Sequence, residues 1–319
     1  MLRRDPNWRE PTRKISRLRP VGSISIVIEM RRCAALLPLI FFGFGSCDFN
    51  VGAHVDLGTG LETSNSGMGF SESRVEISHQ PFKGGKIYCG ETVEVQFHGV
   101  SGLTVSDRQV YPELNIVVTD QSGAKLVTAD NLYQGRGYSP ESAKVLTATL
   151  KVNEKFAGED CKFHMHFLDT KGKGRIDAVL PLKIEALNTP ELKVRENGLT
   201  ASQKGIMSDY GRVINGEAPL GGQIGLLLYD LTGFKEIDGK VFPGAKIEID
   251  SPETGAAIYQ SEDLFAKPES DISAEQAKTM RLYLTPEKSE TGKQYLWKFS
   301  VWDKKGPATL SAEILLKFR

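Results

Sequence analysis

Apolar and polar residues alternate over short stretches along most of this chain, which is the pattern of half-buried β-strands. In the stretches at residues 93–97, 163–167 and 180–184, every second residue is apolar. Long apolar stripes of helical period are missing, and only residues 271–277, with a cap at Ser273, predict one short helical turn. The pattern therefore predicts an all-β protein.

An internal repeat is the second regular feature. Residues 90–184 align with residues 221–318 at an offset of 131 that grows to 134. The repeat preserves inward-facing strand positions and turn residues, in the pairs Val93 and Ile224, Val95 and Leu226, Phe97 and Leu228, Asp107 and Asp238, and Asp169 and Asp303. Each copy contains about seven short strands spaced by turns, which is typical of an antiparallel sandwich of immunoglobulin-like kind.

These patterns divide the chain into five parts. We expect a first β-sandwich domain at residues 74–186, a linker at 187–190 and a second β-sandwich domain at 191–319. Residues 47–73 are rich in Gly, Ser, Thr and Asn without a sustained period, so they predict a flexible tether. Residues 1–46 are expected to be an N-terminal extension and an export signal. The short linker is expected to limit relative motion of the two domains.

Charge and hydropathy restrict the classes of partner. The 40 Lys and Arg residues balance the 40 Asp and Glu residues, so the chain lacks the basic field that favours nucleic acid. The apolar stretch at residues 33–44 is shorter than the roughly 20 residues that a membrane-spanning helix needs. It fits the core of a signal peptide, because Arg31 and Arg32 precede it and Gly45 and Ser46 provide small residues for cleavage.

The cleavage region ends in Phe44-Gly45-Ser46-Cys47, which resembles the lipobox of bacterial lipoproteins. The resemblance covers residues 30–47 and implies that Cys47 carries lipid that holds the mature protein on a membrane. An ordinary signal peptide cut elsewhere and an uncleaved anchor segment are the alternatives.

The resemblance also implies a location in the bacterial cell envelope. We expect the outer membrane. The inner membrane is the alternative, because Asp48 after the lipidated cysteine resembles the inner-membrane retention signal of enteric bacteria. Met30 begins a signal of ordinary proportions, so both Met1 and Met30 remain candidate starts.

Two cysteines, Cys89 and Cys161, remain in the predicted domains. Their repeat counterparts are the apolar residues Leu220 and Tyr295, which places both thiols near the core. In an exported protein such a pair can form a disulfide. Two separate buried thiols are the alternative.

Candidate catalytic and metal-binding residues have simpler explanations. His164 and His166 could begin a zinc site with His98, but all three lie on strand faces opposite the apolar residues, so we expect surface histidines. The single aspartates of the repeated loops are expected to cap turns rather than bind calcium. Motifs for serine hydrolases, zinc proteases and phosphate-binding loops do not occur. We expect no cofactor and no catalysis.

Three aromatic residues are candidates for binding. Trp302 is out of phase with its buried neighbours, and Tyr111 and Phe242 occupy matching loops of the two copies. Such residues stack on sugars or anchor a protein partner, and they can equally pack between the two domains.

The sequence therefore predicts a lipid-anchored cell-envelope protein that acts as a non-catalytic binding or assembly module. Its expected partners are the membrane and an envelope protein, with no nucleic acid. A carbohydrate-binding surface lipoprotein is the second hypothesis. An envelope hydrolase with unrecognised carboxylates is the third.

Overall fold

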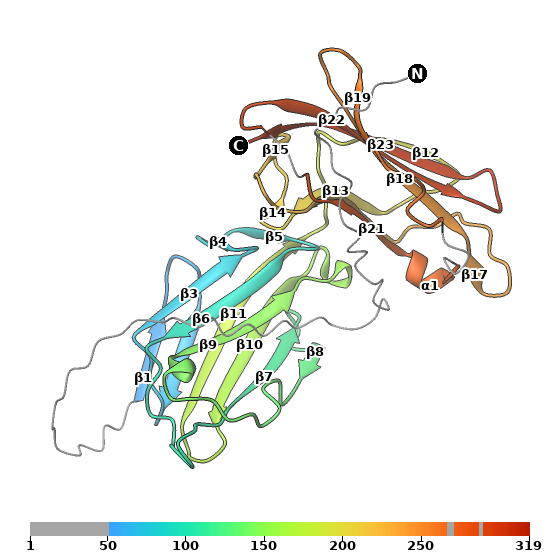
Figure 1. Cartoon of the computed structure of the whole chain (residues 1–319). Coiled ribbons are helices and arrows are strands. Elements are labelled where there is room, and N and C mark those ends of the chain that lie inside the picture. Colours follow the sequence, from blue (N-terminus) through green and yellow to red (C-terminus); the bar gives the residue numbers. More distant parts are fainter. Residues whose placement is uncertain (1–50, 267–270, 287–289) are drawn as a thin grey trace.

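A computed structural model describes residues 51–266, 271–286 and 290–319 of the chain. Nearly all of its regular structure is β-strand, arranged in several sheets, which confirms the all-β prediction. The strands form two bodies that follow each other in sequence, the first blue to green and the second yellow to red (Figure 1). We call residues 51–186 the first half and residues 187–319 the second half. The predicted signal peptide and Cys47 lie outside the described residues.

The first half contains two facing sheets. The larger contains, in order, β1 (Val51–Val55), β2 (Glu62–Ser66), β11 (Arg175–Glu185), β10 (Asp160–Asp169), β7 (Pro112–Thr119) and β8 (Lys125–Ala129), and β5 (Lys86–Tyr88) pairs with β11. The smaller contains β4 (Gln80–Pro81), β3 (Glu72–Ile77), β6 (Thr92–His98) and β9 (Val145–Lys151). Short 3₁₀ turns, η1 (Ser142–Lys144) and η2 (Glu154–Phe156), flank β9.

Among the described residues, the second half repeats this arrangement except for β1, which has no counterpart. Its larger sheet contains β12 (Lys193–Asn197), β23 (Thr309–Phe318), β22 (Gln294–Asp303), β18 (Pro243–Asp250) and β19 (Ala257–Gln260), and β15 (Glu217–Ala218) pairs with β23. Its smaller sheet contains β14 (Gly211–Arg212), β13 (Gln203–Ser208), β16 (Ile224–Tyr229) and β21 (Thr279–Leu284). The remaining elements are β17 (Lys240–Val241), β20 (Ile272–Ser273) and α1 (Ala274–Ala277).

The two halves share strand order and pairing direction. In both, a short strand, β5 or β15, runs parallel to the last long strand, while the neighbouring pairs of long strands are antiparallel. The predicted helical turn is α1, where Ser273 and Gln276 form a capping box. The structure thus extends the sequence repeat to the level of individual strands.

The prediction of a flexible tether at residues 47–73 is wrong for residues 51–73, the part that the structure describes. Residues 51–73 contain β1, β2 and the first residues of β3, and Leu61 and Met68 are fully buried. β2 pairs with β11 exactly as β12 pairs with β23, so the repeat begins near Leu61 rather than near residue 90. The polar composition of β2 hid it, because the apolar anchors of this segment flank the strand instead of alternating within it.

Each half encloses its own hydrophobic core between its two sheets. The predicted inward residues of β6 and β10 are buried, and the rings of Phe97 and Phe167 meet edge to face with centroids 5.5 Å apart. In the second half, Trp297, Phe299 and Val301 of β22 are buried in the equivalent place. The alternation seen in the sequence therefore marks the core faces of both halves.

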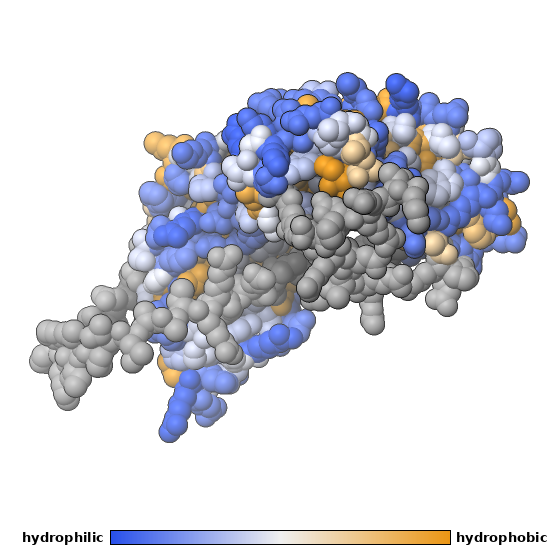
Figure 2. Space-filling model, turned by 45° about the horizontal axis from the view of Figure 1, so that its top comes forward, coloured by the Kyte–Doolittle hydropathy of each residue, from blue (hydrophilic) through white to orange (hydrophobic). Residues whose placement is uncertain are grey.

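The exposed surface is mainly polar. Figure 2 shows one face on which hydrophilic residues predominate and hydrophobic residues occur in small, scattered groups. Exposed large apolar side chains include Leu57, Val105 and Ile214, which lie on separate segments of the chain. Among the described residues, no helix is long and apolar enough to cross a membrane.

Candidate functional site: the seam between the halves and its cleft

The two halves meet along a packed seam, which explains the one strand that departs from alternation. All six residues of β16 are buried, whereas its counterpart β6 buries every second residue. Leu227 and Tyr229, together with Met207 of β13, pack into the core cluster of the first half. Their repeat counterparts, Gln96, His98 and Glu76, are half-buried polar residues. The outer face of the second half's smaller sheet is therefore an apolar contact surface for the first half.

Hydrogen bonds from the linker region complete the seam. The buried Gln203 side chain accepts from the Leu187 backbone N–H at 2.9 Å and donates to the Glu154 carbonyl at 3.3 Å. The Thr189 hydroxyl, also buried, accepts from the Ile206 N–H at 3.0 Å. These linker residues are thus held in the seam and do not form an exposed hinge.

A second set of contacts joins Arg212 of β14 to the first half and to the linker. Its backbone N–H donates to Glu91 at 3.3 Å, its guanidinium lies 3.8 Å from the centroid of the Tyr88 ring, and it donates to the Asn188 carbonyl at 2.6 Å. Burial raises the pKa of Glu91, although backbone hydrogen bonds and Arg212 oppose this. Gly90, at a φ of +94°, lets Leu227 and Tyr229 approach the backbone where a side chain would crowd them.

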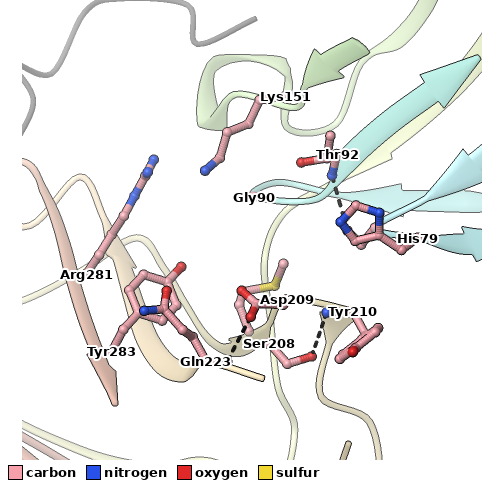
Figure 3. Close-up of a pocket in the computed structure, with 12 residues that line it drawn as sticks. His79, Gly90, Thr92, Lys151, Ser208, Asp209, Tyr210, Gln223, Arg281 and Tyr283 are labelled. Carbon is pink, nitrogen blue, oxygen red and sulfur yellow. Dashed lines mark hydrogen bonds between the residues drawn. The ribbon is translucent and has the colours of Figure 1, made fainter. Parts of the chain in front are cut away.

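A cleft of about 580 Å³ opens beside this seam, and residues of both halves line it (Figure 3). Its volume is within the range of small-molecule sites in proteins. The lining residues are Ser78, His79, Gly90, Thr92, Lys151, Met207, Ser208, Asp209, Tyr210, Gln223, Arg281 and Tyr283.

Two cations dominate the charge of the cleft. Figure 3 shows Lys151, at the end of β9, and Arg281, in β21, extending into the same space from opposite halves. Burial, together with the charge of Arg281, lowers the pKa of Lys151 to about 8. In the part of the chain that the structure describes, neither cation forms an ion pair with a carboxylate.

The remaining polar groups of the cleft are largely engaged. Asp209 is the one acidic residue among the described lining residues, and it accepts from the backbone N–H of Gln223 at 2.9 Å. The Ser78 hydroxyl accepts from the Thr92 N–H at 3.2 Å, and burial raises the pKa of Tyr283 to about 12. The Tyr283 phenol and the two cations are therefore among the donors that the cleft offers to a ligand.

We predict that replacing Lys151 with Met stabilises the protein at pH 7 by about 1–2 kcal/mol, after allowance for solvent screening. The folded state binds fewer protons than the unfolded state between pH 8 and the ordinary lysine value of 10.5. The stability of the native sequence should therefore rise with pH across this window, so the advantage of Met should vanish near its upper end. Urea unfolding at pH 7 and pH 10, with exposed Lys162→Met as the control, checks this. A less stable Lys151→Met protein at pH 7 would contradict it.

The structure places the sequence-predicted cysteines in the first half as free, buried thiols. Cys89 donates to the Asn153 carbonyl at 3.5 Å, and burial raises its pKa to about 12. Burial also raises the pKa of Cys161, to about 11. This is the second of the two arrangements that the sequence left open, and a thiol held protonated in this way is a weak nucleophile.

The three predicted binding aromatics lie apart from the cleft. Tyr111 and Phe242 are half-buried, and each lies beneath a lysine ammonium, Lys171 at 5.0 Å and Lys305 at 5.1 Å from the ring centroid. Trp302 pairs with Gly244 across β22 and β18, and its ring occupies the space of the missing side chain. Each aromatic residue therefore packs against its own half.

The histidines and loop aspartates have the structural roles that their positions indicate. His164 and His166 lie in the larger sheet of the first half and His98 in the smaller. Asp169 accepts from the N–H groups of Thr104 and Lys171, and Asp303 accepts from the corresponding groups in the second half. The predicted turn capping by these two aspartates is confirmed. Within residues 51–266, 271–286 and 290–319, no three His, Cys, Asp or Glu side chains are grouped to hold a metal ion.

Sequence analysis missed Lys151 and Arg281, because nothing in their local sequence relates two residues of different halves. The available clue was the unbroken apolar run at residues 224–229, where the repeat has an alternating strand. An apolar outer face marks a contact between sheets or domains. That clue locates the seam, and the cleft lies at its edge.

No protein-family model matches this chain, and no curated protein matches it. Among solved structures, one titled "pT26-6p" is similar at a TM-score of 0.24 and 10% sequence identity, over 81% of this chain and 63% of that chain. A D1–D4 ectodomain fragment of ICAM-5 is similar at a TM-score of 0.19 and 10% identity, over 95% of this chain and 70% of that chain. The chain thus spans less than two thirds of the first of these structures, and similarities at this level carry no argument about function.

Proposed function

We propose that this chain is a lipid-anchored protein of the bacterial cell envelope that binds a partner without performing chemistry on it. In this proposal, lipid on Cys47 holds two immunoglobulin-like sandwiches at the membrane, preferentially the outer one. The partner is bound at the cleft beside the seam.

The observation that carries the binding role is a cleft to which both halves contribute side chains and whose two cations have no carboxylate partner among the described residues. The buried β16 and the linker contacts fix the two walls of the cleft relative to each other. A preorganised cleft of this kind favours binding because little conformational entropy is lost when the ligand enters. The low thiol reactivity and the turn-capping aspartates give no support to a catalytic role.

Site-specific crosslinking in intact cells tests this function. A photocrosslinking amino acid at position 210 replaces Tyr210, which is 43% exposed at the cleft, and a control at position 105 replaces Val105, which is 58% exposed away from it. We expect a defined adduct from position 210 and none from position 105. Identical adducts from both positions, or none from either, would contradict the role of the cleft.

Mass spectrometry of the native protein tests the anchor. We expect a mature chain that begins at Cys47 and carries the mass of attached acyl chains. An unmodified amino terminus at any other residue would refute the lipid-anchor part of the proposal. Turnover of any substrate by the purified chain in a hydrolase panel would refute the non-catalytic part.

A further inference from the structure

Lys151 differs in its charged neighbours from the other lysines that are exposed to a similar degree. Four lysines are half-buried among the described residues. Lys204 contacts Glu196 at 2.7 Å, and Lys246 and Lys298 likewise contact carboxylates. Lys151 instead faces Arg281, another cation. Half-buried ammonium groups in this fold are therefore neutralised by neighbouring carboxylates except at the cleft.

An arrangement of two cations without a carboxylate is unfavourable in the absence of a ligand. Both like charge and burial destabilise the charged form of Lys151. An anion between the two groups would reverse both effects, because it supplies opposite charge and hydrogen-bond acceptors at the same point. His79 and Asp209 also line the cleft, but Asp209 is bonded to the Gln223 backbone.

The directions of the donors indicate the shape of that anion. Lys151 enters the cleft from the first half, whereas Arg281 and Tyr283 both enter from β21 of the second half (Figure 3). A guanidinium presents a planar fork of donors, and an ammonium presents a compact charge. Donors of different geometry on two facing walls suit a tetrahedral oxyanion, which has acceptor oxygens on every side, better than a flat carboxylate. The cleft of about 580 Å³ has room for a substituent on such a group.

We propose that the cleft binds a phosphate group, held between the Lys151 ammonium and the Arg281 guanidinium. This inference rests on the proposed binding function and adds the chemical class of the ligand. The phosphate group comes from either of two sources, a soluble phosphate ester or the headgroup of an anionic lipid.

Binding measurements on the full-length purified protein test the proposal. Isothermal titration calorimetry with inorganic phosphate and with glycerol phosphate covers the soluble source. Sedimentation of the Cys47→Ala protein, which cannot carry the proposed lipid anchor, with phosphatidylglycerol vesicles covers the lipid source. We expect Lys151→Met and Arg281→Met each to weaken phosphate binding at least tenfold. Lys151→Arg, which keeps the charge, should retain affinity within about threefold. The control Lys162→Met, an exposed lysine on β10, should bind like the native protein.

Each outcome is decisive for the phosphate site. No binding at millimolar phosphate, or equal binding by Lys151→Met, would overturn it, and thermal unfolding of each variant would show that the fold is intact. Binding to vesicles but not to glycerol phosphate would support the site and assign it to lipid. If phosphate fails to bind while position 210 still gives its specific adduct, the phosphate inference fails and the proposed function stands.

Discussion

Replacing Leu227 with Gln is expected to lower the free energy of unfolding by about 2–4 kcal/mol, because it buries an amide in the apolar seam. Leu227 is 1% exposed and belongs to the core cluster of the first half although it lies in the second. Its neighbours in that contact include Tyr229, Met207 and the backbone of Gly90. The amide would lose water and find few partners there.

Equilibrium unfolding in urea, followed by intrinsic fluorescence, measures this effect. We expect the variant to unfold in two separated transitions, since the seam is what couples the two halves. The matched control is the reciprocal change Gln96→Leu, at the equivalent position of β6, where the side chain is half-buried on an outer face. That change should alter stability by less than about 0.5 kcal/mol. Equal effects at positions 96 and 227 would show that the seam does not couple the halves.

Much of the fold was predictable because it depends on local alternation. Val93, Val95 and Phe97 face the core as the period of two requires, and Ser273 caps the short helix α1. Alternation of side chains between the two faces of a strand is a property of the strand alone, so it can be predicted without knowledge of the tertiary structure. The same alternation separated His164 and His166 from the apolar face.

The failed predictions concern residues whose roles depend on distant partners. The segment at 51–73 is polar in composition, yet β2 is held by its pairing with β11, more than a hundred residues later. Long-range pairing of this kind overrides local composition. Lys151 and Arg281 also depend on distant partners, since they lie in strands of different halves and line one cleft only because the halves meet.

The departures from the repeat carry information that the repeat itself does not. Where the two halves agree, as at Asp169 and Asp303, the residues maintain the fold of a single sandwich. Where they differ, as at Gln96 and Leu227, the difference marks a contact between the sandwiches. Trp302 shows a third case, because it fills the space that Gly244 leaves on the outer face of β18.

The two halves also use different residues to hydrogen-bond a core strand, β7 or β18, to the loop that packs beside it. In the first half, the buried carboxylate of Glu113 on β7 accepts from the N–H groups of Leu114 and Tyr133 at 2.9 Å, and from Gly135 at 3.3 Å. In the second half, Gly244 replaces that glutamate and Asp263 of the loop accepts from the strand. In each half, one carboxylate thus joins the strand to the loop. It lies on the strand in the first half and in the loop in the second.

Replacing Glu113 with Ala is accordingly expected to destabilise the first half by about 3–5 kcal/mol, because three N–H donors lose a charged acceptor in a buried place. Glu113→Gln keeps one carbonyl acceptor, so a smaller loss of about 1–2 kcal/mol is expected. Exposed Glu159→Ala serves as the control and should change stability by less than about 0.5 kcal/mol. Urea unfolding gives these energies, and amide hydrogen exchange at Tyr133 and Gly135 should accelerate in Glu113→Ala. Unchanged exchange at both amides would mean that the carboxylate does not hold the loop.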